Sequence, residues 1–242
     1  MKPADWVAGA TGFVGRNVVA QLLARGRRAV AHVRPDSSQL AQWQERFAAS
    51  GAEVDPTPWE LDALARRFAE LRPSCLFLCI GTTQKRARAD KLDGNPYELI
   101  DYGLTKLAVD AAVQAHAADP EISPRVVYLS SIGAAVDARS AYLSWRGRAE
   151  EVVKQSGLPW MIARPSIITE SASGDGARDD RRPAERAAAV VGDAALALLG
   201  GLGARKLRAR YRSTTPDVLA AALIRLSENP AAGLIASGDD LR

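Results

Sequence analysis

Short apolar stretches alternate along most of this chain with segments that have the periodicity of amphipathic helices. The first stretch is Trp6–Ala8, and from Arg16 to Arg25 the apolar residues recur on one helical face. A second strand is predicted over Ala29–Val33. Glycines stand at the joints, because three of them follow the first stretch and Gly26 stops the helix. Strand, glycine turn, helix and strand together predict a βαβ unit.

The same alternation continues to the C-terminal part of the chain. Further strands are predicted at residues 52–54, 75–80, 126–129, 160–163 and 233–236. Helices are predicted from a cap at residues 36–38 to Gly51, from the capping box Thr57–Glu60 to Pro73, over 97–117, 140–156 and 184–199, and from Thr215 onward. The polar segment 84–94 is predicted to be a mobile loop, and segment 166–183 is predicted to be an exposed loop or flap. This order predicts an α/β fold with one doubly wound parallel sheet and helices on both faces.

Length and composition favour one soluble domain. The 242 residues suffice for one α/β domain and are too few for two ordinary ones. We therefore expect a single domain with its core in residues 5–168 and a loop and small C-terminal part in residues 169–242. The apolar fraction of 47% and charged fraction of 25% are typical of globular proteins. No apolar run is long enough to span a membrane and the chain enters its first strand without a signal peptide, so a cytoplasmic location is expected.

The cysteines, histidines and basic residues point away from several other classes of protein. Cys75 and Cys79 fall on one face of a buried strand, so they are expected to be reduced thiols. His32 and His116 have no metal-ligand spacing around them, so a metal site is not expected. The net charge is +4, but the basic clusters are short and lack interleaved aromatic residues, which favours a solvated surface over nucleic-acid binding.

The glycine turn after the first strand carries the clearest chemistry. Gly9 allows a tight bend, Gly12 lets the backbone approach a pyrophosphate, and Gly15 lets the following helix press against the sheet. The free N–H groups at the start of that helix point toward the phosphates. We therefore predict a dinucleotide site that includes Gly9, Thr11, Gly12, Phe13, Val14 and Gly15.

Arg34 predicts which dinucleotide is bound. A site for NAD places Asp or Glu at the end of the second strand, where it binds the ribose 2′-hydroxyl, whereas this chain has arginine followed by Ser37 and Ser38. A guanidinium can pair with a 2′-phosphate through two hydrogen bonds, and a carboxylate would repel it. The sequence thus favours NADP(H) over NAD, with a solvated surface arginine as the alternative.

Several blocks of residues occur in a fixed order over residues 5–168. They are Gly9–Gly15, Gly81–Thr83, Ile100–Tyr102, Leu129–Ala134, Tyr142 with Gly147 and Glu150, and Arg164–Pro165. In this order they resemble the atypical branch of the short-chain dehydrogenase/reductase superfamily, with its Tat-interacting-protein-like oxidoreductases and NmrA-like regulators. The resemblance implies a single-domain NAD(P)-binding Rossmann fold. It also implies cofactor contacts from Gly81, Thr82, Thr83, Ser130 and Pro165.

The resemblance further implies a catalytic set. In the superfamily a serine polarises the substrate carbonyl, a tyrosine transfers the proton, and a lysine four residues later holds the nicotinamide ribose and lowers the tyrosine pKa. Ser131 or Ser130 and Tyr142 match this pattern, but Arg146 stands in the place of the lysine. Tyr142 and Arg146 share a helical face, so the positive charge is retained. Arginine does not deprotonate in proteins, which disfavours a proton relay through it.

Two hypotheses about function follow. In the first, the protein is an NADP(H)-dependent oxidoreductase for a small carbonyl or alcohol, with Ser131, Tyr142 and Arg146 in the catalytic set. In the second, it binds NADP(H) without turnover, as a redox sensor or an assembly or regulatory protein. A structural role is the alternative for each residue, since a tyrosine near a helix start can simply pack and a serine pair can cap a turn. The expected partner is a small molecule, and the long helices would permit a homodimer.

Overall fold

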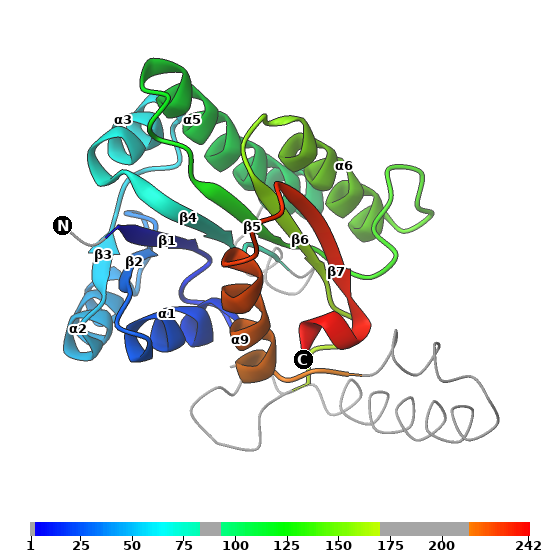
Figure 1. Ribbon diagram of the computed structural model, residues 1–242, viewed down its shortest axis with the longest axis horizontal. Helices are drawn as coiled ribbons and strands as arrows, with labels where there is room; N and C mark the ends of the chain where they lie inside the picture. Colours follow the sequence, from blue (N-terminus) through cyan, green and yellow to red (C-terminus); the bar gives the residue numbers. More distant parts are fainter. Residues whose placement is uncertain (1–2, 83–92, 170–212) are drawn as a thin grey trace.

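The computed structural model describes residues 3–82, 93–169 and 213–242. Its centre is a seven-stranded parallel sheet with the strand order β3-β2-β1-β4-β5-β6-β7 (Figure 1). The strands are β1 (Ala4–Ala8), β2 (Arg28–His32), β3 (Glu53–Asp55), β4 (Pro73–Leu78), β5 (Arg125–Leu129), β6 (Trp160–Arg164) and β7 (Gly233–Ser237). The described helices are α1 (Gly15–Ala24), α2 (Leu40–Ser50), α3 (Leu61–Leu71), η1 (Tyr97–Leu104), α5 (Thr105–Ala118), α6 (Ala141–Gln155), α9 (Pro216–Ser227) and η3 (Gly238–Leu241). The predicted doubly wound α/β fold is confirmed.

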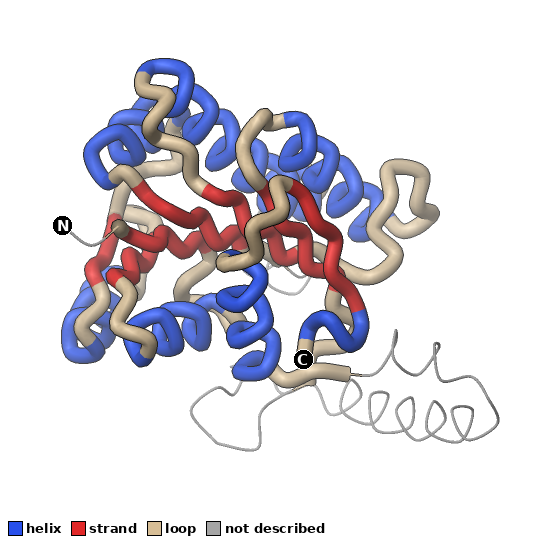
Figure 2. The backbone as a smooth tube through the Cα atoms, viewed as in Figure 1, coloured by secondary structure: helices blue, strands red, loops and turns tan. Residues whose placement is uncertain are grey.

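Helices cover both faces of the sheet, as Figure 2 shows. On one face lie α1, α2 and α9, and on the other lie α3, α5 and α6. The chain runs from β1 outward to β3 and then returns to place β4 on the other side of β1. This reversal of strand order is the switch point at which α/β sheets bind their ligands.

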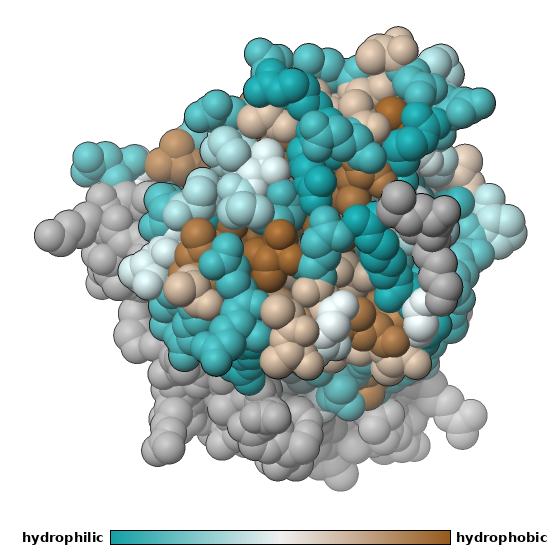
Figure 3. All heavy atoms as spheres, turned by 90° about the vertical axis from the view of Figure 1, so that its left-hand side faces the viewer, coloured by the Kyte–Doolittle hydropathy of each residue, from teal (hydrophilic) through white to brown (hydrophobic). Residues whose placement is uncertain are grey.

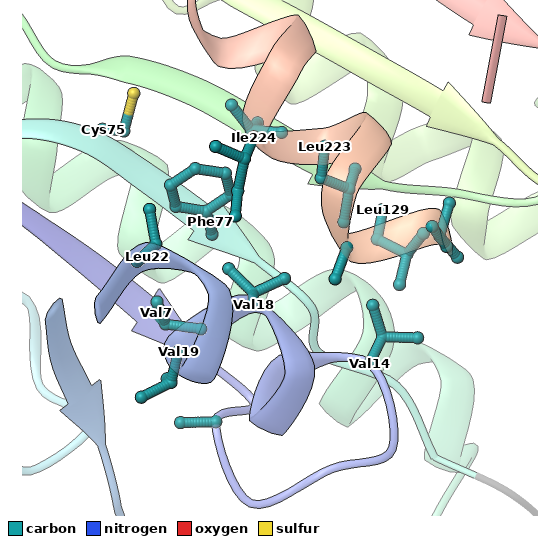
Figure 4. Packing of buried hydrophobic residues seen from close by; sticks show 14 of the residues in the cluster. Val7, Val14, Val18, Val19, Leu22, Cys75, Phe77, Leu129, Leu223 and Ile224 are labelled. Carbon is teal, nitrogen blue, oxygen red and sulfur yellow. The ribbon is translucent and has the colours of Figure 1, made fainter. Parts of the chain in front are cut away.

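The core on the face of the sheet that α1 covers contains residues from both the N-terminal and the C-terminal parts of the described chain. Val18 and Leu22 of α1 pack with Leu223 and Ile224 of α9 over Phe77 of β4, and all of these side chains are buried (Figure 4). In addition, β7 pairs in register with β6. The segment 213–242 therefore completes the sheet and its core instead of merely extending it.

The core on the opposite face contains a group of aromatic rings around Trp6. The indole Nε1 of Trp6 donates to Asp55 Oδ2 over 2.7 Å, and its ring centroid lies 5.0 Å from those of both His32 and Phe68. Nε2 of His32 lies 2.7 Å from the carbonyl oxygen of Thr57. Burial lowers the pKa of His32 below its ordinary value.

The ends of two helices differ from the prediction. The backbone N–H and hydroxyl of Thr57 both donate to Asp55 Oδ1, so the capping box was wrong and α3 begins only at Leu61. Arg72 ends α3 in the left-handed region with φ 47°, and Pro73 opens β4. The predicted cap at residues 36–38 was also wrong, because α2 begins at residue 40 without a side-chain cap.

The long helix predicted over residues 97–117 has two parts. Its first two turns, η1, are a π-helix, and the α-helix α5 continues from Thr105. A π-helix widens the turn by one residue and changes which side chains face the sheet. Thr83, most of the predicted loop 84–94, residues 170–183 of the predicted loop 166–183 and the predicted helix 184–199 lie outside the described residues.

The edge strand β3 is short and charged. Its Glu53 carboxylate pairs with Arg28 over 2.6 Å and with Arg67 over 2.7 Å. Such charges discourage pairing with another strand. Figure 3 views this side of the molecule, and its coloured surface is mostly hydrophilic with apolar residues in small groups. Within the part of the chain that is described, no helix has the length and apolar character needed to cross a membrane.

The buried His32 predicts how stability depends on pH. Its pKa is lower in the folded state than in the unfolded state, so acid favours unfolding. The free energy of unfolding should therefore fall as the pH drops from about 7.5 to about 5.5, with a contribution from His32 of at most about 1.4 kcal/mol per pH unit. In thermal melts, His32→Gln should show a smaller loss of stability over this range than the wild type. Equal losses in both proteins would contradict the prediction.

Candidate cofactor and active site

The glycine turn after β1 is fixed by close backbone contacts. Gly9 has φ +70°, and a Cβ there would lie 2.5 Å from the carbonyl oxygen of Cys79. A Cβ on Gly15 would lie 2.1 Å from the carbonyl oxygen of Gly9. The N–H of Gly12 donates to that same oxygen over 2.9 Å. The first and third glycines are therefore required by the turn itself, which brings the start of α1 against the end of β1.

The start of α1 suits an anion. Val14 is its N-cap, no side chain caps the helix, and its first turn carries no acidic residue. The positive end of the helix dipole is thus not neutralised by a carboxylate of the first turn. Thr11 and Phe13 precede this turn and are half-buried. Contact of Thr11 and Phe13 with a pyrophosphate stays a prediction, and their position beside the start of α1 is compatible with it.

The other predicted cofactor residues follow the carboxyl ends of neighbouring strands. Arg34 comes after β2, Gly81 and Thr82 after β4, Ser130 and Ser131 directly after β5, and Pro165 directly after β6. Because the strands are parallel, these ends meet at one edge of the sheet. The structure therefore brings the described members of the predicted set to the same edge as the glycine turn.

Arg34 is exposed at the end of β2. Its side chain is 46% exposed, and Nε lies 3.6 Å from Asp36 Oδ1. An ion pair in water contributes little, so the guanidinium can reorient toward a phosphate at small cost. Binding of a 2′-phosphate by Arg34 stays a prediction.

The two serines after β5 have different surroundings. The hydroxyl of Ser130 is buried and donates to Glu150 Oε1 over 2.6 Å. Glu150 also accepts from Arg164 Nε over 2.8 Å, which ties the ends of β5 and β6 to α6. Ser131 is half-buried. Because the Ser130 proton is held by a carboxylate, Ser131 is the better candidate to donate to a substrate oxygen.

Tyr142 lies in the first turn of α6, which begins at Ala141. It is half-buried, and its ring meets that of Tyr97 in η1 edge to face, with 5.3 Å between the centroids. The guanidinium carbon of Arg146 lies 5.4 Å from the centre of the Tyr142 ring. The expected proximity of Tyr142 and Arg146 on one helical face is confirmed.

Arg146 is held by groups of the protein. The residue is 5% exposed, and its Nη1 donates to the carbonyl oxygen of Leu129 over 2.7 Å and to the hydroxyl of Tyr128 over 3.2 Å. Its Nη2 donates to the carbonyl oxygen of Ile80 over 3.0 Å and lies 2.8 Å from Asp101 Oδ1. The guanidinium therefore bridges the ends of β4 and β5.

The surroundings keep Arg146 charged. Burial acts to lower the pKa of the guanidinium, but Tyr128 and Asp101 outweigh this effect and raise it. Burial raises the pKa of Tyr128 itself to about 12, although Arg146 opposes the shift. At neutral pH the site therefore contains a permanent cation and a neutral tyrosine at position 128.

Sequence reasoning did not assign a role to Asp101, which is the buried partner of Arg146. A signal was present in the chain: an arginine on the buried side of a helix requires a carboxylate nearby. Gly81 belongs to the same arrangement, because a Cβ there would lie 2.5 Å from Nη2 of Arg146. The guanidinium thus occupies the space that a side chain at position 81 would need.

This combination of a switch point, a glycine turn and an uncapped helix start defines a dinucleotide-binding Rossmann protein. The family profile described as NAD(P)H-binding matches residues 9–200. The chain belongs to this NAD(P)H-binding family, within the atypical short-chain dehydrogenase/reductases.

Two curated proteins and one solved structure illustrate the similarity. The chain is 30% identical to Protein TIC 62, chloroplastic, of Arabidopsis thaliana over 66% of its length, and it spans 26% of that protein. It is 31% identical to Protein fmp52, mitochondrial, of Emericella nidulans, over 74% of this chain and 70% of that protein. A putative NAD-dependent epimerase/dehydratase from Bacillus halodurans superposes with a TM-score of 0.62 at 18% identity, covering 98% of this chain and 95% of that one. At this identity the structure supports the fold alone.

The contact between Gly81 and Arg146 predicts a pair of coupled substitutions. Gly81→Ala should destabilise the protein by about 1–3 kcal/mol, because the new methyl group meets Nη2. Arg146→Lys removes that nitrogen, so the double variant should lose less stability than the sum of the two single variants. Urea denaturation measures these losses. The matched control combines Gly81→Ala with Arg148→Lys on the exposed side of α6, where the losses should simply add; additivity in the Arg146 pair as well would refute the contact.

Proposed function

We propose that this protein is an NADP(H)-dependent oxidoreductase that transfers a hydride between the nicotinamide and a small carbonyl or alcohol. Membership in the NAD(P)H-binding family supports the cofactor class. The observation that carries the proposal is the placement of Ser131 and Tyr142 at the sheet edge that also holds the glycine turn. This edge combines a cradle for the cofactor with a donor and an acid at the reacting end.

The residues fit a bound dinucleotide. Gly9 and Gly15 permit the tight turn, because a Cβ at either position would clash with backbone atoms, and the uncapped start of α1 behind this turn would receive the pyrophosphate. Arg34 would pair with the 2′-phosphate, which favours NADP(H) over NAD. Gly81, Thr82, Thr83 and Pro165, with Ser130 behind them, would line the nicotinamide half, although Thr83 lies outside the described residues.

The chemical roles follow from the side chains. When bound, NADPH would supply a hydride for the carbonyl carbon. Ser131 Oγ donates a hydrogen bond to the carbonyl oxygen and polarises it. Tyr142 then gives its hydroxyl proton to that oxygen, and the tyrosinate recovers a proton from water. The guanidinium of Arg146, 5.4 Å from the Tyr142 ring, lessens the cost of the transient negative charge.

A second candidate function is binding of NADP(H) without turnover, as a sensor or an assembly or regulatory protein. One observation favours it: both terminal nitrogens of Arg146 already contact groups of the protein. A side chain so engaged is poorly placed to hold a ribose as the family's lysine does.

The substrate class, the cytoplasmic location and the formation of a homodimer stay predictions. The two relatives are named for the chloroplast and the mitochondrion.

Titration with NADPH and NADH tests the cofactor. NADPH should bind at least about tenfold more tightly than NADH, because Arg34 can pair with the additional phosphate. Arg34→Gln should weaken NADPH and leave NADH nearly unchanged, as measured by quenching of tryptophan fluorescence. Arg25→Gln, at the far end of α1, is the matched control and should behave as the wild type. Equal affinities of the wild type for NADPH and NADH would contradict a binding site for the 2′-phosphate.

A panel of small carbonyl compounds tests for turnover. Tyr142→Phe should lower kcat by about a hundredfold or more while NADPH affinity is preserved, because only the proton donor is removed. Ser131→Ala should lower kcat, whereas Ser144→Ala, at a half-buried serine of α6 whose hydroxyl donates to the carbonyl oxygen of Val136, should not. If NADPH binds but the wild type reduces no carbonyl, the binding protein without turnover becomes the supported function.

A further inference from the structure

Asp101 is an acidic residue that is completely buried. It lies in η1 and is 0% exposed. Its Oδ2 accepts the backbone N–H of Thr82 over 3.1 Å, and its Oδ1 lies 2.8 Å from Nη2 of Arg146. Its own carbonyl oxygen accepts the hydroxyl of Thr105 over 2.7 Å, at the junction between η1 and α5. The carboxylate therefore connects η1 both to α6 and to the segment after β4.

Burying this charge is costly. Burial raises the pKa of the Asp101 carboxyl, and the guanidinium of Arg146 and the N–H of Thr82 oppose the shift. A pair of apolar residues in such a place is often as stable as an ion pair. Stability alone therefore does not explain why an aspartate and an arginine meet here, and the pair has a further role in holding a neighbouring segment in place.

The pair fixes the segment Gly81–Thr82 from two sides. Arg146 binds the carbonyl oxygen of Ile80 immediately before it and leaves no room for a side chain at Gly81. Asp101 binds the N–H of Thr82 at its other end. The path of the chain as it leaves β4 is therefore determined by side chains from η1 and α6.

The position of this segment in the sheet indicates which part of a dinucleotide it would meet. In a Rossmann protein the two nucleotide halves lie on either side of the switch point, and the adenosine ribose is read at the end of the second strand. Arg34 follows β2 on that side, and Gly81–Thr82 follows β4 on the other. The segment held by Asp101 and Arg146 thus belongs to the nicotinamide half.

We propose that Asp101 is a positioning residue for the nicotinamide half of the cofactor. It acts through the guanidinium of Arg146 and the amide of Thr82, and it holds the Gly81–Thr82 backbone where the nicotinamide ribose would rest. This inference rests on the proposed binding of NADP(H). It assigns Asp101 no contact with the substrate and no part in proton transfer.

Comparison of two ligands separates this role from a general effect on folding. NADPH carries both halves, whereas adenosine 2′,5′-bisphosphate carries only the adenosine half with its 2′-phosphate. Asp101→Asn keeps an oxygen for the Thr82 amide but removes the charge that faces Arg146. It should weaken NADPH about tenfold or more and change the affinity for the bisphosphate less than about twofold. Calorimetric titration measures both affinities.

Two further variants provide the controls. Asp110→Asn removes an exposed carboxylate that pairs with Lys106 on the neighbouring helix α5, and it should leave both affinities unchanged. Arg34→Gln should weaken both ligands, because it acts on the half that they share. A loss confined to NADPH in Asp101→Asn, against a loss of both ligands in Arg34→Gln, is the expected pattern.

Removal of one partner from a buried ion pair can prevent folding. The double variant Asp101→Leu/Arg146→Met avoids this outcome because it removes both charges of the pair, and it should fold, lose affinity for NADPH and keep affinity for the bisphosphate. The inference is overturned if a folded Asp101 variant binds NADPH as the wild type does, or loses both ligands equally. If the wild type binds the bisphosphate but not NADPH, both this inference and the proposed oxidoreductase function fail. If the wild type binds neither ligand, the proposed cofactor itself is wrong.

Discussion

The bridge that Arg146 forms between the carboxyl ends of β4 and β5 is the interaction on which the candidate site depends. Parallel strands end in free carbonyl groups, and the guanidinium of Arg146 donates hydrogen bonds to carbonyl oxygens at two of these ends at once. Because the charge is permanent and buried, a carboxylate must accompany it, and Asp101 does so. Because the guanidinium of Arg146 occupies the space beside position 81, glycine is favoured there. One side chain thus determines residue types in two other segments.

An arginine at position 146 binds its surroundings differently from a lysine. A lysine ammonium is a compact charge on a flexible stem, whereas the planar guanidinium binds in fixed directions. Here those directions lead to backbone carbonyls and to Asp101, so the charge stabilises the framework beneath Tyr142 while its carbon still lies 5.4 Å from the ring. The two candidate functions, an oxidoreductase and a protein that binds NADP(H) without turnover, therefore differ in one respect. They differ in whether the charge of Arg146, held by groups of the protein, suffices to support proton transfer from Tyr142.

Local patterns in the sequence were enough to predict most of the elements and the glycine turn. The spacing of Gly9 and Gly15 and the alternation of strands and helices depend on neighbours in the chain, and both predictions agree with the structure. The partners of Arg146 and Ser130 lie 45 and 20 residues away, beyond the reach of any local pattern. The capping box at Thr57 failed for a different and local reason, because Asp55, two residues earlier, accepts both donors of Thr57. What sequence reasoning missed was the choice between alternative hydrogen-bond partners.

The two halves of the proposed cofactor site differ in rigidity, and this difference has a consequence for specificity. On the β2 side, Arg34 is exposed and only loosely paired with Asp36, so it can adapt to its ligand. On the β4 side, the backbone is fixed by buried charges and by a glycine without free space. A preorganised surface loses little entropy on binding, whereas an adaptable one loses more. If Arg34 binds a 2′-phosphate as proposed, substitutions near it would change that affinity without disturbing the end of the site where Tyr142 and Ser131 lie.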